Sequence, residues 1–490
     1  MAIDKGMGVK LPSNTRTKVS VPGQQGQIEQ IQGKLQQQQN QQPVEITQTE
    51  DGGAEVDFDP QALAALGGES HDENLAEFLE EMILNEIGST IIEDYTENKS
   101  SRQDWEDSYT KGLDLLGFKY ENRSEPFQGA SGATHPVLAE AVTQFQSLAY
   151  KELLPASGPV RAQVMGKVDD AKEMQAERVK EYMNYQLMVN MKEYEPEFDQ
   201  MLFNLPLAGS TFKKVYYDSI LGRCVSKFIP AEELVVPYNA TSLEDAESIT
   251  HAIRMTGNEL LKYQVSGFYR DVEISPVSDD PSAVEDKKNR IMGVSADMNE
   301  VHTLLECHCE LDLEGFEDIN QEGEATGIKL PYIVTVDDGT GTVLSIRRNF
   351  DAQDPLRVRR DYFVHFKFLP GLGLPFKGPS ETLLSLMGVV VQAGQRFASI
   401  ADMQVGEGNQ NAAVGTTVAL LERGSRVMSA IHKRLYQSLK CEFMLLATTM
   451  KTYLPPEYPY DVVGGERQIF AADFDVKIDI IPVAVSYVQS

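Results

Sequence analysis

The chain has 490 residues, of which 41% are hydrophobic and 24% charged, and this is enough apolar material for a large core. Its formal net charge of −30 argues against a protein that binds nucleic acid tightly through a basic surface. The same charge is compatible with a protein that lets DNA pass without binding it. No apolar run is long enough to cross a bilayer, and we expect no secretory signal. Four cysteines are too few for a disulfide framework in a chain of this length, so we expect assembly in a reducing cytoplasm.

Residues 1–74 form an arm that we expect to be disordered. Gln24 to Gln48 is glutamine-rich, and an acidic stretch with several glycines follows it. Such segments offer too little apolar surface to offset the entropy lost on ordering. A polar coiled coil is the alternative, but the arm lacks a sustained heptad of apolar residues.

From Asn74 onwards, apolar residues recur at helical spacing and predict core-facing helices. The first stripe is Leu75, Phe78, Leu79, Met82, Ile83, Ile87 and Ile91, and it continues at Trp105, Tyr109, Leu113 and Leu116. Further helices are predicted over 137–154 and over about 169–208. The period then changes to two over 210–240, which predicts a β-hairpin around Leu221-Gly222 followed by a strand.

The next stretch, 241–370, mixes both periods. The phrase "SLEDAESITHAIRMTGNELLKYQVSGFY" predicts a helix with Ser242 as its N-cap, and the polar residues 270–298 predict a mobile loop. Strands are predicted within 301–315, 329–350 and 361–370, with a turn at Asp338-Gly339. From Ser380 to about Leu454 the chain is predicted to be helical apart from one loop, and a strand is predicted near its end.

One glycine-rich stretch, "GLGLPFKGPS", superficially resembles a phosphate-binding loop. A Walker A motif places Lys and Ser or Thr directly after its second glycine, whereas here Lys377 precedes Gly378. Pro375 and Pro379 also remove two backbone donors that would bind phosphate. We therefore interpret the stretch as a loop that leads into a helix with Pro379 in its first turn.

A second stretch, "HTLLECHCEL", brings four soft ligands together at His302, Cys307, His308 and Cys309. On a strand, Cys307 and Cys309 point to one face and His308 to the other, and no second ligand pair lies nearby. Zinc requires four convergent ligands, so we expect buried thiols here and no metal site.

Two basic groups are candidates for contacts. Arg347, Arg348, Arg357, Arg359 and Arg360 form the most basic patch of the expected folded region. They could contact phosphates, but we favour pairing with acidic residues of a neighbouring subunit. The helix "AIHKRLYQSLKCEF" carries His432, Lys433, Arg434 and Lys440 opposite an apolar face, which is typical of a solvated basic face or an intersubunit ion pair. We find no catalytic or cofactor-binding arrangement.

Three long stretches carry a resemblance to a known family. They read "GASGATHPVLAEAVTQFQSLAYKELLPASGPVRAQVMG", "FIPAEELVVPYNATSLEDAESITHAIRMTGNELLK" and "KGPSETLLSLMGVVVQAGQRFASIADMQVGEGNQNAAVGTTVALLERGSRVMSAIHKRLYQSLKCEF". In these stretches, and with gaps across most of 75–480, the chain resembles the portal proteins of tailed bacteriophages, the head-to-tail connectors, of the large type found in short-tailed phages.

The resemblance implies a mainly helical α+β ring subunit that has a helical wing and a smaller mixed stem and clip region. Portals form homo-oligomeric rings, typically dodecamers, at one capsid vertex of the virion, where double-stranded DNA is packaged and ejected. The implied partners are further copies of the chain, the terminase large subunit, tail adaptor or connector proteins, a major capsid or scaffold protein, and DNA that passes through non-specifically. The resemblance implies no cofactor, no membrane and no enzymatic activity.

The resemblance also implies a division of the chain. The expected parts are a disordered arm at 1–74, a wing with a β-hairpin at 75–240, a stem and clip at 241–370, a seam at 371–375, a wing return at 376–455 and the strand of a truncated crown at 456–490. At the seam, two phrases that similar portals separate by a long channel-lining segment are joined almost directly. A natural shortening, an assembly artefact and a divergent lineage all fit this join.

Two other functions remain as alternatives. One is a non-ring scaffold or internal structural protein of the virion. The other is a DNA-packaging ATPase, which the failed spacing around Lys377 disfavours.

Overall fold

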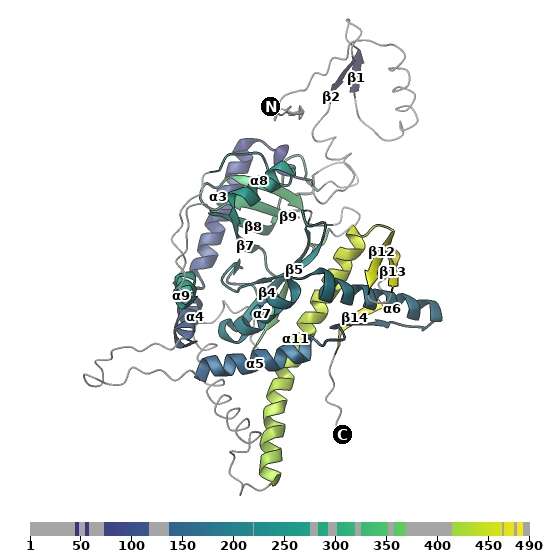
Figure 1. Cartoon of the computed structure of the whole chain (residues 1–490). Coiled ribbons are helices and arrows are strands. Elements are labelled where there is room, and N and C mark those ends of the chain that lie inside the picture. The colour runs from purple at the N-terminus through teal and green to yellow at the C-terminus, as the bar shows by residue number, and fades with distance from the viewer. Residues whose placement is uncertain are drawn as a thin grey trace, which may run out of the picture. The chain divides into compact units, whose positions relative to one another are not determined.

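The structure is a computed structural model that combines helices with antiparallel strand pairs (Figure 1). It describes residues 45–48, 54–57, 73–116, 137–218, 220–274, 283–292, 301–318, 325–350, 357–368, 414–462, 465–474 and 478–483. The mixed α+β class expected from the sequence is therefore confirmed. None of the helices in these ranges is long and apolar enough to span a bilayer.

Two compact units share the chain, and each is assembled from separate stretches. Unit 1 contains Met1–Asp94, Ala252–Ser278 and Asn299–Arg360, and unit 2 contains Tyr95–His251, Asp279–Met298 and Asp361–Ser490. The expected arm lies largely outside the described residues. Within it the structure describes one antiparallel pair, β1 (Glu45–Gln48) with β2 (Ala54–Asp57).

Unit 1 is built on a sheet in which β10, β9, β8 and β7 follow one another. The elements are η1 (Leu75–Glu77), the start of α3 (Glu81–Ser100), the end of β7 (Ile249–Thr256), α8 (Gly257–Val265), β8 (Val301–Leu311), β9 (Leu330–Asp337) and β10 (Val343–Arg348). Strand alternation divides the side chains between two cores. Cys307, Val334 and Ile346 pack with α3 on one face, whereas Leu304 and Leu344 pack with Leu260 of α8 on the other.

A hairpin joins β9 and β10, and its turn approaches α3 closely. The amide of Gly341 donates to the carbonyl of Asp337 at 2.9 Å, and Gly341 has a φ of +72° that a residue with a side chain rarely adopts. The predicted hairpin is thus confirmed, but Gly341 rather than Gly339 supplies the left-handed residue. A Cβ on Gly88 of α3 would lie 2.1 Å from the carbonyl oxygen of Gly341, so only glycine fits there.

Unit 2 surrounds a three-stranded sheet in the order β11-β4-β5, formed by β11 (Phe363–Lys367), β4 (Ser210–Asp218) and β5 (Arg223–Ile229). The hairpin predicted around Leu221-Gly222 joins β4 to β5. Asp218 forms it by accepting hydrogen bonds from the backbone amides of Ile220 and Leu221, both at 2.9 Å, and Gly222 has a φ of +63°.

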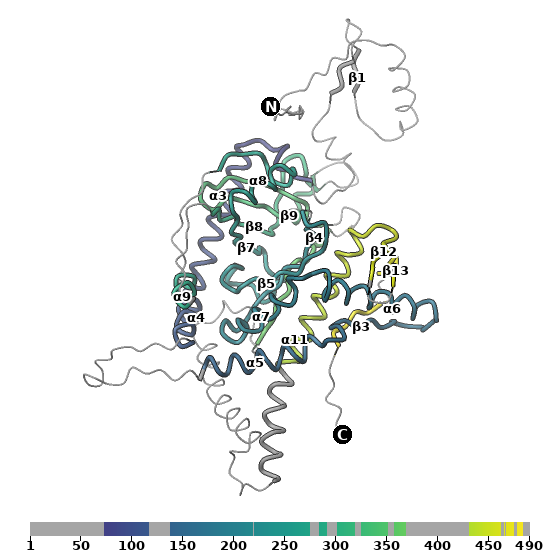
Figure 2. The backbone as a smooth tube through the Cα atoms, in the orientation of Figure 1, coloured from purple at the N-terminus to yellow at the C-terminus, as the bar shows by residue number. Residues whose placement is uncertain are grey.

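Helices and short strand pairs complete unit 2. The elements are α4 (Gln103–Leu116), α5 (Val137–Leu153), β3 (Val160–Val164), α6 (Asp170–Tyr185), the π-helix η2 (Gln186–Asn190), α7 (Tyr194–Ala208), β6 (Leu234–Val235), α9 (Ala283–Met292), α11 (Val414–Tyr453), β12 (Glu457–Val462), β13 (Gly465–Phe470), η4 (Ala471–Asp473) and β14 (Ile478–Pro482). The later part of α11 lies alongside β4, β11 and β14. Figure 2 traces the backbone of this part of the helix.

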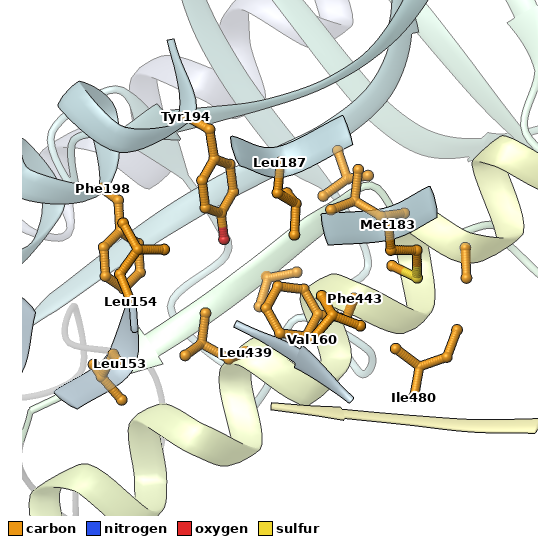
Figure 3. Packing of buried hydrophobic residues seen from close by; sticks show 14 of the residues in the cluster. Leu153, Leu154, Val160, Met183, Leu187, Tyr194, Phe198, Leu439, Phe443 and Ile480 are labelled. Atoms are coloured by element: carbon orange, nitrogen blue, oxygen red, sulfur yellow. The ribbon is translucent and has the colours of Figure 1, made fainter. Parts of the chain in front are cut away.

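The main core of unit 2 gathers side chains from distant parts of the chain. Figure 3 shows Leu153 of α5, Tyr194 and Phe198 of α7, and Leu439 and Phe443 of α11 converging there, each at most 1% exposed. The stripe of α11 continues through Leu446 and Met450 at steps of three and four residues. A second core packs Trp105, Tyr109 and Leu113 of α4 against the other face of the sheet, as the helical stripe predicted.

Three sequence-based predictions are wrong. Residues 242–248 are not helical: β7 begins at Ile249, and α8 begins only after Thr256, whose hydroxyl forms a capping box with Glu259. The expected loop at 270–298 contains the helix α9. The first stripe is also interrupted, since η1 ends before α3 begins and Met82 is 75% exposed while Leu84 takes the core position.

Candidate functional site

The five arginines predicted as contacts all lie in unit 1, but the structure does not bring them to one surface. Arg347 and Arg348 end β10, and Arg357, Arg359 and Arg360 belong to the segment that follows it. Successive residues of a strand point to opposite faces of a sheet. The neighbours Arg347 and Arg348 are therefore separated by the sheet itself.

Arg348 and Arg357 gather around Tyr332 of β9. Arg348 lies 3.5 Å from a carboxylate oxygen of Glu73, and Arg357 forms an ion pair with Asp318. Burial raises the pKa of Tyr332 to about 12, and the positive charges of the two arginines act in the opposite direction. Both guanidinium groups thus already have carboxylate partners within unit 1.

Aromatic rings complete this cluster. The guanidinium carbon of Arg348 lies 5.7 Å from the ring centre of Phe316, and that of Arg357 lies 5.9 Å from the ring centre of Phe350. Tyr332 packs edge-on against Phe350 and donates from its hydroxyl to the carbonyl of Phe316 at 3.3 Å. The cluster therefore combines apolar packing with balanced charge, and it leaves little uncompensated charge for phosphate.

Arg347 lies on the other face of the sheet, with its guanidinium carbon 4.1 Å from the ring centre of Phe268. Its Nε is buried and has no hydrogen-bond partner. The remaining two arginines are half-buried; the backbone amide of Arg360 donates to the carbonyl of Asn349 at 2.9 Å, and both residues make further interactions, so neither is free. Whether any of the five contacts nucleic acid or another subunit stays a prediction.

The cysteine-rich strand is β8, and its faces divide as the alternation predicts. Cys307 is buried in the core with Cys309 packed against it, whereas His308 faces the other side and bonds to Glu306 at 2.9 Å. Hydrogen bonding to Cys307, together with burial, holds the pKa of the Cys309 thiol well above its usual range. Among the described residues, no group of three or more potential ligands could hold a metal ion.

Sequence reasoning missed a charged pair in the core of unit 2. The Nζ of Lys213 on β4 lies 2.6 Å from Oε1 of Glu442 on α11, and both side chains are 0% exposed. The hydroxyl of Ser226 donates to the same oxygen at 2.7 Å, and Nζ lies 3.8 Å from the ring centre of Tyr194. The alternation of β4 could have placed Lys213 on the face of Val215, but nothing in the sequence links it to a residue 229 positions later.

The low polarity of this core shifts the titration of its members. Burial lowers the pKa of Lys213, although the charge of Glu442 opposes the shift. Burial, reinforced by Glu442, raises the pKa of the Tyr194 hydroxyl well above its usual range. The Oε2 of Glu442 has no hydrogen-bond partner, so this carboxylate depends on Lys213 and Ser226 for compensation.

The predicted basic helix is part of α11, and its apolar face is confirmed. Ile431, Leu435, Leu439 and Phe443 are all buried. On its other sides, His432 pairs with Glu152, and Lys440 lies 2.9 Å from Asp479. Lys433 is exposed and Arg434 is half-buried. The glycine-rich stretch with Lys377 and the seam at 371–375 lie outside the described residues.

No protein-family model matches the chain, and no curated protein matches it either.

Proposed function

We propose that the chain is a portal subunit that forms a ring at a capsid vertex, through which double-stranded DNA is packaged and ejected. The observation that carries this proposal is that two of the three portal-like phrases, far apart in the sequence, build one core. Leu153 and Val160 come from the first phrase, and Leu439 and Phe443 from the third, and all four are at most 1% exposed. The residues that carry the resemblance therefore include side chains that pack together in one core.

The segments on either side of the seam support the same proposal. Phe368, close before the seam, packs edge-on against Phe145 of α5 with ring centres 5.0 Å apart. His365 of β11 accepts through its backbone carbonyl from the hydroxyl of Ser438 on α11 at 2.8 Å. The chain thus leaves and re-enters the same packed unit, which is compatible with a segment of variable length inserted between β11 and α11.

The charge of the chain suits the proposed passage of DNA. With 74 acidic and 44 basic residues, the subunit carries a formal charge of −30. A wall with this charge repels the DNA backbone, whereas a wall lined with lysine would retain it through release of counterions. In this proposal a separate terminase drives the DNA, tail adaptors dock on the ring, and the subunit itself encloses the DNA.

Single-particle imaging of the purified chain tests this proposal. We expect negative-stain images to show closed rings with a central hole, and mass photometry to give one multiple of the subunit mass of 54.5 kDa. Compact single copies at every concentration, ionic strength and scaffold concentration tried would contradict the portal function. They would favour the non-ring virion protein instead.

An ATP hydrolysis assay separates the enzymatic alternative. We expect no turnover above background from the purified chain with or without DNA. Turnover that Lys377→Ala abolishes would establish a nucleotide site in the glycine-rich stretch and overturn the proposal.

A further inference from the structure

The outward face of α11 carries an uncompensated positive charge. Along the part of the helix whose side chains are described, the exposed positions follow one stripe: Lys433, Gln437, Cys441, Met444, Thr448, Lys451 and Thr452. Their spacing of three or four residues places them on one side of the helix, opposite the buried core stripe. This outward stripe contains two lysines and no acidic residue.

The absence of acid from the outward stripe has a structural cause. Residues 431–453 contain a single acidic residue, Glu442, and that carboxylate is fully buried against Lys213. His432 and Lys440 are already paired with Glu152 and Asp479. In the described part of the chain, the positive charges of the helix that have no carboxylate partner are therefore Lys433, Arg434 and Lys451.

Among these three residues, Arg434 shows the lack of a carboxylate partner most clearly. Its Nε is buried from solvent and has no hydrogen-bond partner within the described structure. Burial alone lowers the pKa of its guanidinium, because no neighbouring carboxylate stabilises the charged form. A guanidinium that is partly removed from water without a partner is costly, and a carboxylate supplied from outside the chain would satisfy it.

We propose that the outward stripe of α11, together with Arg434, docks an acidic surface of a second copy of this chain. This inference rests on the proposed ring, because a closed cyclic ring is built from a head-to-tail contact between two different surfaces of neighbouring subunits. In a chain with 74 acidic and 44 basic residues, acidic surfaces are abundant, and such a surface complements the charge of Lys433, Arg434 and Lys451.

The pattern of the stripe favours a protein partner over DNA. Lys433 and Lys451 are about 27 Å apart along the helix axis, at 1.5 Å per residue. Between them the stripe has no charged residue of its own, although burial and the nearby charges of Glu244 and Asp361 raise the pKa of the Cys441 thiol, and Met444 is 50% exposed. A face that follows phosphates needs cations at short intervals, whereas an uncharged centre with charged ends is typical of a protein interface.

Charge reversal tests the docking surface. We expect Lys433→Glu/Arg434→Glu to raise the concentration needed for ring assembly by at least about tenfold, and wild-type assembly to weaken as NaCl is raised. The matched control is Lys111→Glu/Lys167→Glu, which makes the same change in net charge at two exposed lysines elsewhere in unit 2. Lys433→Glu alone, at an exposed position, should also impair assembly, and circular dichroism checks that each variant is folded.

Cys441 provides a second readout on the stripe itself, because it is the only exposed cysteine of the four in the chain. A benzophenone maleimide on Cys441 is photoactivated in rings that mix labelled light subunits with unlabelled, isotopically heavy subunits. We expect crosslinks from the light Cys441 peptide to an acidic heavy peptide. Crosslinks only within a subunit, or only to added DNA, would overturn the inference.

The outcomes separate this inference from the proposed function. Rings formed by the wild type and equally well by Lys433→Glu/Arg434→Glu would leave the portal proposal intact and refute the docking surface. Loss of rings in the control as well would show that net charge, and not the stripe, governs assembly, and would also refute it. A wild type that forms no ring refutes both.

Discussion

Lys213 and Glu442 are the residues on which the core of unit 2 depends most for charge balance. Both are fully buried, so removal of one leaves the other without compensation. We expect Lys213→Met or Glu442→Gln alone to lower the free energy of unfolding by about 3–5 kcal/mol. Urea denaturation followed by the fluorescence of Trp105, the only tryptophan and a buried residue of unit 2, measures this loss.

The double variant Lys213→Met/Glu442→Gln is the control for this pair. It removes both charges and keeps an amide oxygen to accept from the hydroxyl of Ser226. We expect it to recover most of the stability lost in either single variant, because well-packed neutral groups replace a buried ion pair at little cost. Additive losses in the double variant would show that the two charges do not act as a pair.

His365 makes the stability of unit 2 depend on pH. Burial, assisted by the charge of Lys367, holds its pKa well below the ordinary value of 6.5, while its ring stacks on Phe212 at 4.8 Å. The unfolded chain binds a proton at His365 below pH 6.5 and the folded chain does not. Stability is therefore present above pH 6.5 and is lost as the pH falls below it.

The size of this effect follows from the linkage relation. We expect His365 to contribute a loss of about 1 kcal/mol between pH 7 and pH 5.5. The measurement compares urea midpoints at the two pH values for the wild type and for His365→Gln, which cannot take up the proton. An identical pH dependence in the two proteins would contradict this assignment.

Among the elements, α3 and the β9–β10 turn show how a small residue sets a packing distance. A Cβ at Gly88 would lie 2.1 Å from a backbone oxygen of Gly341, which cannot move without opening the hairpin. We expect Gly88→Ala to cost about 1–3 kcal/mol in unit 1 in spite of the higher helix propensity of alanine. Faster hydrogen exchange in β9 and β10 would report this loss.

Gly257→Ala is the matched control in the same unit. The nearest atom to its added Cβ is Nε2 of His302 at 3.8 Å, which is an ordinary contact, and Gly257 opens α8 without a positive φ. We expect no loss of protection there. Equal effects of the two substitutions would mean that the close approach of Gly88 to the turn does not limit the packing.

The element types also show where local patterns fail. Helix periodicity correctly predicted α4, α5 and the described part of α11, since each has an apolar face that meets a core. The same reasoning assigned a helix to the residues of β7, because "ITHAIRMT" fits both periods over so short a run. These residues form a strand because they pair with neighbouring strands of the sheet, and such pairing cannot be recognised from a short stretch of sequence.

At the scale of the whole molecule, the two units are interleaved along the chain, so neither is a continuous stretch of sequence. The main core of unit 2 needs α5 and α7 from one part and α11 from another. We expect a fragment of residues 95–251 alone to lack a cooperative thermal transition, and co-expression with residues 361–490 to restore one. A cooperative melt of the first fragment with native Trp105 emission would contradict this expectation.

The candidate sites were predicted only in part. The five arginines predicted as one basic patch do not share a surface, whereas the prediction that Cys307 and His308 lie on opposite faces of a strand is confirmed. Sequence reasoning did not separate Arg347 from Arg348, although alternation along the strand predicted within 329–350 would have placed the two on opposite faces. It also missed Lys213, whose partner comes from a helix more than two hundred positions away.

The sequence by itself determined the mixed class, the hairpins, the apolar stripes of α4 and α11 and the strong negative charge, because these follow from composition and from spacing within a short window. Only the tertiary structure decided which charges are compensated. It buried Glu442 against Lys213, paired Arg348 and Arg357 with carboxylates, and left Arg434 without one. The physical reason is that charge compensation depends on distances between residues remote in the chain, and the fold alone sets those distances.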